Sequence, residues 1–202
     1  MKKRTTSSYA LTWTLIGVAT LGIALSIQLT PDSSWMTWHL SRLGEGHSLA
    51  AAVFNFTFIF AALILAKLAA RIMSETSAKG TNTLRTLLFS VAICWIGVGT
   101  FPFDQFPVIH NLFGYSQFLI MGYLMLRLRH ICPSFSERTY TIGLGVAITT
   151  GLLLALFHLT QFTTLLVVEI IGQLGIYAWL LSMANDLRHV AVISFTTNDV
   201  TE

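Results

Sequence analysis

The chain has 202 residues, of which 54% are hydrophobic and only 10% are charged. Soluble domains carry about 25% charged residues, so this composition excludes an ordinary soluble protein and indicates a membrane protein. The net charge of +3 is modest. The two cysteines, Cys94 in an apolar run and Cys132 in a basic loop, support neither a disulfide framework nor a cysteine zinc site.

Six apolar runs follow one another, and each is about long enough to cross the roughly 30 Å hydrocarbon core of a bilayer. They predict an all-α fold, a polytopic membrane protein with six transmembrane helices in one bundle. The expected spans are residues 9–29, 49–66, 84–101, 108–126, 140–160 and 165–184, between an N-terminal segment 1–8 and a tail 185–202. The basic start also resembles a signal peptide, but the first run is longer than a usual signal core and no Ala-x-Ala follows it, which favours an uncleaved span.

Basic residues are distributed unevenly between the two ends of these expected helices. One end holds Lys2, Lys3, Arg4, Lys67, Arg71, Lys79, Arg85, Arg127, Arg129, Arg138 and Arg188, whereas the other holds only Arg42. The positive-inside rule therefore predicts that both termini are cytoplasmic, in the plasma (inner) membrane. This topology explains the basic residues without a nucleic-acid partner, and the basic rim is expected to attract anionic lipids.

The connection between the third and fourth spans is rich in polar and turn-forming residues. Its two prolines end one helix and start the next, because proline lacks a backbone N–H and has a fixed φ. Asp104, His110 and Asn111 lie between and after these prolines. We expect this turn to form the rim of a polar pocket that opens on the outer side of the bundle.

Other polar residues fall at a similar depth in neighbouring spans. Glu169 and Gln173 share one helical face by their four-residue spacing. A charged side chain facing lipid costs about 2.5–3.5 kcal/mol, so Glu169 is expected to face protein or water. Small residues at every fourth position predict inward-facing sides that place Asn55 and His158 inside the bundle. The stripe before His158 consists of Gly143, Ala147, Gly151 and Ala155. The candidate pocket residues are Asn55, Asp104, His110, Asn111, His158, Glu169 and Gln173.

Structural roles stay open beside these functional ones. Glu169 could form a hydrogen bond with Gln173, His158 or Asn55 instead of binding a ligand. Asp104 could bond its own backbone, which is common for aspartate in turns. Asparagines within the spans could serve as hydrogen-bonding links between helices. The histidines could be packed or interfacial side chains.

A metal site is a further possibility. His39, His47, His110, His158 and Glu169, together with Asp104, could supply three zinc ligands. No His-x-x-x-His or His-Glu-x-x-His spacing supports a zinc cofactor. Haem is disfavoured because the histidines lie near the outer edge. A serine hydrolase would need an activated serine, and only Ser41 and Ser48 lie near these groups.

Short motifs carry a resemblance to a known family. They are His39-Leu-Ser-Arg-Leu-Gly44, Phe54-Asn55, Gly99-Thr-Phe-Pro-Phe-Asp104, His110-Asn111 and Gly114. Over residues 10–185 the chain resembles the bacterial six-span family called domain of unknown function 998, and more distantly the Frag/DRAM-type proteins, which include a factor for GPI-anchor lipid remodelling. The resemblance implies a six-helix membrane fold and no particular activity. The chain departs from the pattern at Arg42, where the family typically has an acidic residue.

The polar cluster on one side of the membrane favours a pocket that binds or modifies a lipid or another amphiphile. A small transporter or proton-coupled carrier, with Glu169 as the titrating group, is the first alternative. It would need a polar path to the cytoplasm, broken helices or inverted repeats, and the sequence indicates none of these. A metal-dependent intramembrane hydrolase is the second. Membrane lipids are the expected partners, and a homo-oligomer or a partner membrane protein stays open.

Overall fold

A computed structural model describes residues 7–31, 39–75, 80–160 and 164–198 of the chain. These residues form six α-helices and one 3-10 helix, and the described part contains no strand, which confirms the all-α prediction. The helices are α1 (Ser8–Leu29), α2 (Leu49–Glu75), α3 (Thr81–Thr100), α4 (Pro107–Ile131), α5 (Glu137–Thr160) and α6 (Leu165–Asn198), and the 3-10 helix is η2 (Leu40–Gly44).

The helix starts follow from local chemistry. The Ser7 hydroxyl accepts a hydrogen bond from Ala10 N at the start of α1, and Ser48 does the same for Ala51 N at the start of α2. Serine is favoured there because the first turn of a helix leaves N–H groups without partners. Pro107 is the first residue of α4, where its missing N–H costs nothing.

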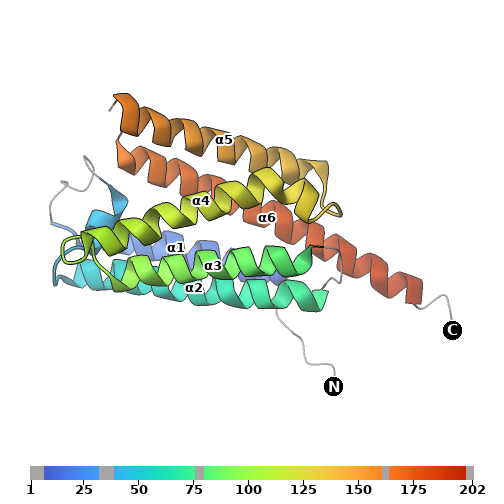
Figure 1. Ribbon diagram of the computed structural model, residues 1–202. Helices are drawn as coiled ribbons and strands as arrows, with labels where there is room; N and C mark the ends of the chain where they lie inside the picture. Colours follow the sequence, from blue (N-terminus) through green and yellow to red (C-terminus); the bar gives the residue numbers. More distant parts are fainter. Residues whose placement is uncertain (1–6, 32–38, 76–79, 161–163, 199–202) are drawn as a thin grey trace, which may run out of the picture.

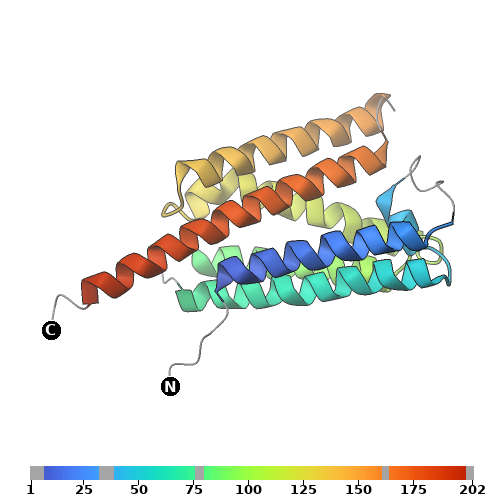
Figure 2. The same cartoon turned by 180° about the vertical axis from the view of Figure 1, so that it is seen from behind.

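The helices run up and down and form a closed bundle (Figures 1 and 2). Each consecutive pair of helices packs together, and α1 also packs against α6. The helix η2 and the α3–α4 turn lie at the end opposite to the two chain termini (Figure 1). That end therefore brings together residues from the first loop, the central turn and the start of α6.

Five helices are long and apolar enough to cross a membrane, namely α1, α2, α3, α5 and α6. By this length and composition the protein is an integral membrane protein with several spans. The helix α4 has 25 residues, about 38 Å at 1.5 Å per residue, so it is long enough. It carries His110, Asn111 and Gln117 in its first half, which makes it less apolar than the others.

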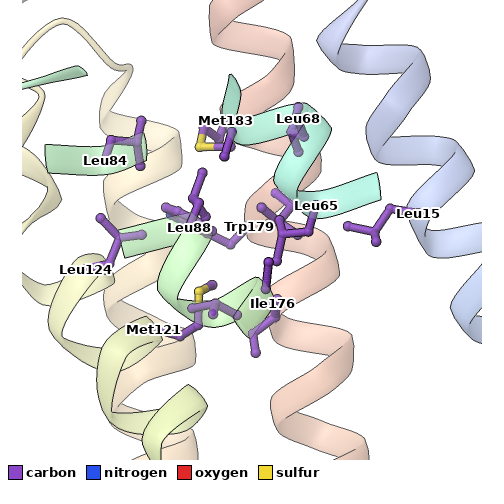
Figure 3. Packing of buried hydrophobic residues seen from close by; sticks show 14 of the residues in the cluster. Leu15, Leu65, Leu68, Leu84, Leu88, Met121, Leu124, Ile176, Trp179 and Met183 are labelled. Atoms are coloured by element: carbon purple, nitrogen blue, oxygen red, sulfur yellow. The ribbon is translucent and has the colours of Figure 1, made fainter. Parts of the chain in front are cut away.

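Below that end, a continuous apolar core fills the bundle. Leucines from α1, α2, α3 and α4 surround Trp179 and Met183 of α6, all fully buried or nearly so (Figure 3). The indole of Trp179 lies where α5 has Gly143, and a Cβ there would lie 2.9 Å from its Nε1 atom. The first glycine of the predicted small-residue stripe therefore does permit close packing of α5 on α6.

The helices extend beyond several expected ends. The helix α2 continues to Glu75, α4 to Ile131 and α6 to Asn198, so most of the expected C-terminal tail is helical. Apolar runs mark the part of a helix that lies in lipid, whereas a helix continues wherever no residue interrupts it. Lys2, Lys3, Arg4 and Lys79, used in the orientation argument, lie outside the described residues.

Candidate functional site

The site is built around η2, which carries the segment from His39 to Gly44. Its N-terminal end is held by α6, because the Glu169 carboxylate accepts a hydrogen bond from Leu40 N. Its C-terminal end is held by α2, because Asn55 Nδ2 donates to Gly44 O at 3.0 Å. An acceptor at the N–H end and a donor at the carbonyl end are the partners that helix termini require.

Two further contacts fix the segment in place. Asp104 Oδ2 accepts a hydrogen bond from Gly46 N at 3.1 Å, which ties the first loop to the α3–α4 turn. Gly44 lies directly on α2, and a Cβ there would lie 2.4 Å from Asn55 Oδ1 and 2.8 Å from Phe54 Cδ1. Only glycine allows this approach without displacement of its neighbours. The loop is therefore held by three different elements.

A cavity of about 260 Å³ lies beneath η2. Its polar lining consists of His39, Ser41, His110, Asn111, Tyr115, Gln117, Glu169 and Gln173. Its apolar lining consists of Ile23, Leu40, Phe54, Phe58, Val98, Phe103, Phe118, Phe157 and Leu165, with Gly114 between them. Because Asn111 is exposed and lines the cavity, the cavity reaches the surface beside α4. It is thus amphipathic and open on one side.

His39 and Ser41 form the most organised pair of this lining. Ser41 Oγ lies 2.9 Å from His39 Nδ1, and both residues are buried. The other ring nitrogen, Nε2, faces Glu45 Oε1 at 3.8 Å, and Arg42 Nε lies 3.8 Å from Glu45 Oε2. Burial, together with His110 and Arg42 nearby, lowers the pKa of His39 to about 4, so the ring is neutral at pH 7. Burial also raises the pKa of Glu45, while Arg42 opposes that effect.

His110 and His39 both contact Phe103. The Phe103 ring lies 5.0 Å from the His39 ring and 5.8 Å from the His110 ring, edge to face in both cases. His110 Nδ1 lies 2.8 Å from Phe101 O, and a carbonyl can only accept, so Nδ1 carries the hydrogen. In the neutral ring, Nε2 is therefore an acceptor.

Six of the seven predicted pocket residues fall into two groups. His110, Asn111, Glu169 and Gln173 line the cavity, as the pocket hypothesis requires. Asn55 and Asp104 do not line it and hold the loop above it instead. Among the described residues, Asp104 bonds the first loop at Gly46 N and not its own turn. These two residues therefore position the site. The spacing of residues within one segment of the chain does not reveal such a role, because each bond joins two different segments.

The expectation that His158 points into the bundle is wrong. Its side chain is exposed, with its ring 5.7 Å from that of Tyr115, and it does not line the cavity. The second half of the small-residue stripe on α5 turns away from its neighbours, because Gly151 and Ala155 are exposed and nothing lies near Gly151. The α5 helix packs closely only in its first half, so a regular stripe was a poor guide to its second half.

Sequence reasoning missed several cavity residues. Gln117 lines the cavity, is 9% exposed, and its Oε1 atom has no hydrogen-bond partner in the described part of the chain. The sequence does contain a signal for Gln117. This residue lies seven positions after His110, which is two helical turns, so both side chains lie on the same face of the helix. Tyr115 lines the cavity although it was not among the predicted pocket residues, and Ser41 was considered only as a weak nucleophile. The contribution of α1 through Ile23 was not expected.

The structure does not favour a zinc site. Among the described residues no group of three His, Cys, Asp or Glu side chains could hold a metal ion. Of the five weaker metal candidates, His39, His110 and Glu169 line the cavity, whereas His47 and His158 are exposed and do not line it.

Fold and site together define a multi-pass, all-helical membrane protein with an amphipathic cavity at one end of its bundle. In comparisons with protein-family models, curated proteins and solved structures, the chain matches none of them. The resemblance to domain of unknown function 998 stays a prediction carried by short motifs.

Proposed function

We propose that the protein binds the polar end of a membrane lipid or another amphiphile in the cavity beneath η2. The observation that carries the proposal is the amphipathic lining, with a carboxylate and neutral polar groups set among aromatic and aliphatic walls. Ligand sites commonly combine mostly apolar walls with a few placed polar groups. A buried amide without a hydrogen-bond partner destabilises the folded protein. A ligand that bonds to the polar atoms of this cavity would offset that unfavourable free energy.

The lining favours a ligand end that donates hydrogen bonds. Glu169 offers a carboxylate, His110 offers the lone pair of Nε2, and Gln117 Oε1 has no partner among the described residues. These three groups lie on α4 and α6 and are acceptors. An ammonium group or a set of hydroxyls complements them, whereas a bare phosphate does not. Phosphatidylethanolamine and glycerol-type headgroups have this chemistry.

The cavity volume limits how much of a lipid it holds. About 260 Å³ is slightly below the roughly 300–1,000 Å³ of sites that enclose a whole small molecule. A headgroup and the first atoms beyond it fit, and acyl chains stay outside against the apolar surface. Leu112, which follows Asn111 on α4, and Leu159, two residues after Phe157 on α5, are exposed apolar side chains.

We place this site at the outer leaflet of the plasma (inner) membrane, with α4 as a sixth span and both termini cytoplasmic. Three polar residues of α4, namely His110, Asn111 and Gln117, line the cavity, and His110 and Gln117 are buried there, so those two do not face lipid. Lys67, Arg71, Arg85, Arg127, Arg129 and Arg138 lie toward the helix ends opposite to η2. The positive-inside rule supports this orientation.

A carrier receives less support. A proton or solute path would have to continue from the cavity through the layer of Leu88, Leu124 and Trp179, which are fully buried (Figure 3). In the described residues this layer is apolar. Transport would therefore need a large rearrangement, whereas headgroup binding needs none.

Native mass spectrometry of the gently extracted full chain tests the proposal. We expect phosphatidylethanolamine to be retained at a higher collision energy than phosphatidylcholine, whose quaternary ammonium lacks N–H donors. Gln117→Leu combined with Glu169→Gln should abolish this difference. Ser90→Ala is the matched control, because Ser90 of α3 does not line the cavity and its hydroxyl bonds to Thr86 O within α3, and it should leave the difference unchanged. Equal retention of both lipids by the unaltered chain would contradict the proposal.

A further inference from the structure

The cavity contains a serine in an activating environment. Ser41 lines the cavity with its Oγ atom 2.9 Å from His39 Nδ1. Either atom of this pair can donate, so the position of the imidazole hydrogen decides the role of the serine. The Glu45 carboxylate faces Nε2 at 3.8 Å, which favours the hydrogen on Nε2. We assign this tautomer, and the Ser41 hydroxyl then donates to Nδ1, which acts as its acceptor.

These three groups have the roles of a nucleophile, a base and an orienting carboxylate. A serine hydroxyl is a weak nucleophile until an adjacent base accepts its proton. The base in turn needs a partner that fixes its tautomer and stabilises its protonated form. Such sites are recognised by geometry and roles on unrelated folds, and here the use of Nδ1 for the serine follows from the two-residue separation of His39 and Ser41.

The scaffold around the pair is unusually constrained for a loop. Glu169, Asn55 and Asp104 bond three backbone groups between Leu40 and Gly46, and each comes from a different element. Two of these bonds satisfy the ends of η2, and the third ties the segment to the α3–α4 turn, so together they hold it in one position. Catalytic groups need such fixed positions, because they must be held within about 0.5 Å of the productive geometry.

We propose that Ser41 is the nucleophile of an acyl-transfer reaction, with His39 as its base and Glu45 as the positioning residue, acting on an ester of the bound amphiphile. This inference rests on the proposed binding of an amphiphile in the cavity. A headgroup held by Glu169 and Gln117 leaves the first ester of a lipid near the apolar part of the lining. Asn111 and Gln117 supply side-chain N–H groups of the kind that stabilise an oxyanion.

The reaction balances with water as the only co-reactant. Ser41 Oγ attacks the ester carbonyl carbon, and its proton moves to His39 Nδ1. The tetrahedral intermediate collapses, the bond to the alcohol oxygen breaks, and the alcohol leaves with the proton from Nδ1. Water then attacks the acyl-serine and gives its proton to the same nitrogen. The carboxylic acid leaves, and Ser41 recovers its proton from His39.

An alkyl fluorophosphonate reports this chemistry independently of the natural substrate, because an activated serine forms a P–O bond with it and releases fluoride. We expect the full chain in detergent to gain one adduct, mapped by peptide mass spectrometry to Ser41. Ser41→Ala should remove it, and His39→Gln should slow it by about a hundredfold or more, the usual contribution of a positioned base. Ser48→Asn is the matched control in the same loop, since asparagine keeps the helix cap of α2 but has no hydroxyl.

The outcomes separate this inference from the proposed function. Labelling of Ser41 that depends on His39 supports the nucleophile. An unaltered chain that retains phosphatidylethanolamine but gains no adduct at Ser41 overturns it and leaves the binding proposal intact. An adduct on Ser48, or labelling of Ser41 that His39→Gln does not slow in a folded variant, also overturns it. Labelling of Ser41 without preferential lipid retention overturns the binding proposal and requires another ester substrate.

Discussion

The hydrogen bond between Glu169 and Leu40 N gives the sharpest test of how the site is held. Glu169→Leu keeps a similar side-chain volume but removes the acceptor, so the first N–H of η2 loses its partner. Hydrogen bonds to charged groups contribute about 1.5–3 kcal/mol. We therefore expect local opening of residues 40–46 to become easier by about 2 kcal/mol, while the buried core around Trp179 stays unchanged.

Hydrogen–deuterium exchange measures this change directly. Since 1.4 kcal/mol corresponds to a factor of ten, amides of residues 40–46 should exchange roughly 30-fold faster in Glu169→Leu. Glu169→Gln keeps a carbonyl acceptor and should show a smaller increase. Gln173→Leu is the matched control, one turn further along α6 on the same cavity wall, and should leave exchange of this loop unchanged. Equal loop exchange in Glu169→Leu and the unaltered chain would refute the reasoning.

Three further predictions concern stability. Gly44→Ala should lower the unfolding free energy by about 1–3 kcal/mol in thermal unfolding, because its Cβ overlaps Asn55, whereas Gly122→Ala, with nothing within 4 Å, should not destabilise. Trp179→Ala should lower it by about 3–5 kcal/mol, since a fully buried indole leaves a cavity; unchanged unfolding would contradict the core assignment. The pKa of His39 falls from 6.5 to about 4 on folding. As the pH is lowered, the unfolded chain therefore binds a proton at His39 before the folded chain does. Stability should be complete above about pH 6.5 and decline toward pH 4 by roughly 3 kcal/mol, and His39→Gln should remove that part of the decline.

The helices could be predicted from sequence because hydrophobic runs of membrane length leave few alternatives. Glu169 could be placed inside the bundle because a carboxylate that faces lipid is energetically costly. The loop could not be predicted. Asn55 and Asp104 form hydrogen bonds with the segment 40–46, which follows no α-helical or strand periodicity. A periodic pattern in the sequence therefore cannot predict either bond.

His158 illustrates the opposite error. Its position after a small-residue stripe predicted a buried side chain, yet that stripe is packed only at Gly143 and Ala147 and is exposed from Gly151 onward. A small residue permits close packing but does not require it. Gln117 was missed although it lies two turns after His110 on α4, because that spacing alone does not show which way the helix face points, whereas the cavity shows that its amide faces inward.

A crystal structure from a lipidic mesophase doped with phosphatidylethanolamine tests the central claim most directly. We predict a headgroup in the cavity beneath η2, with its ammonium within hydrogen-bonding distance of Glu169 and its ester next to Ser41. A cavity filled by protein side chains, or a headgroup bound only elsewhere on the helices, would contradict the account.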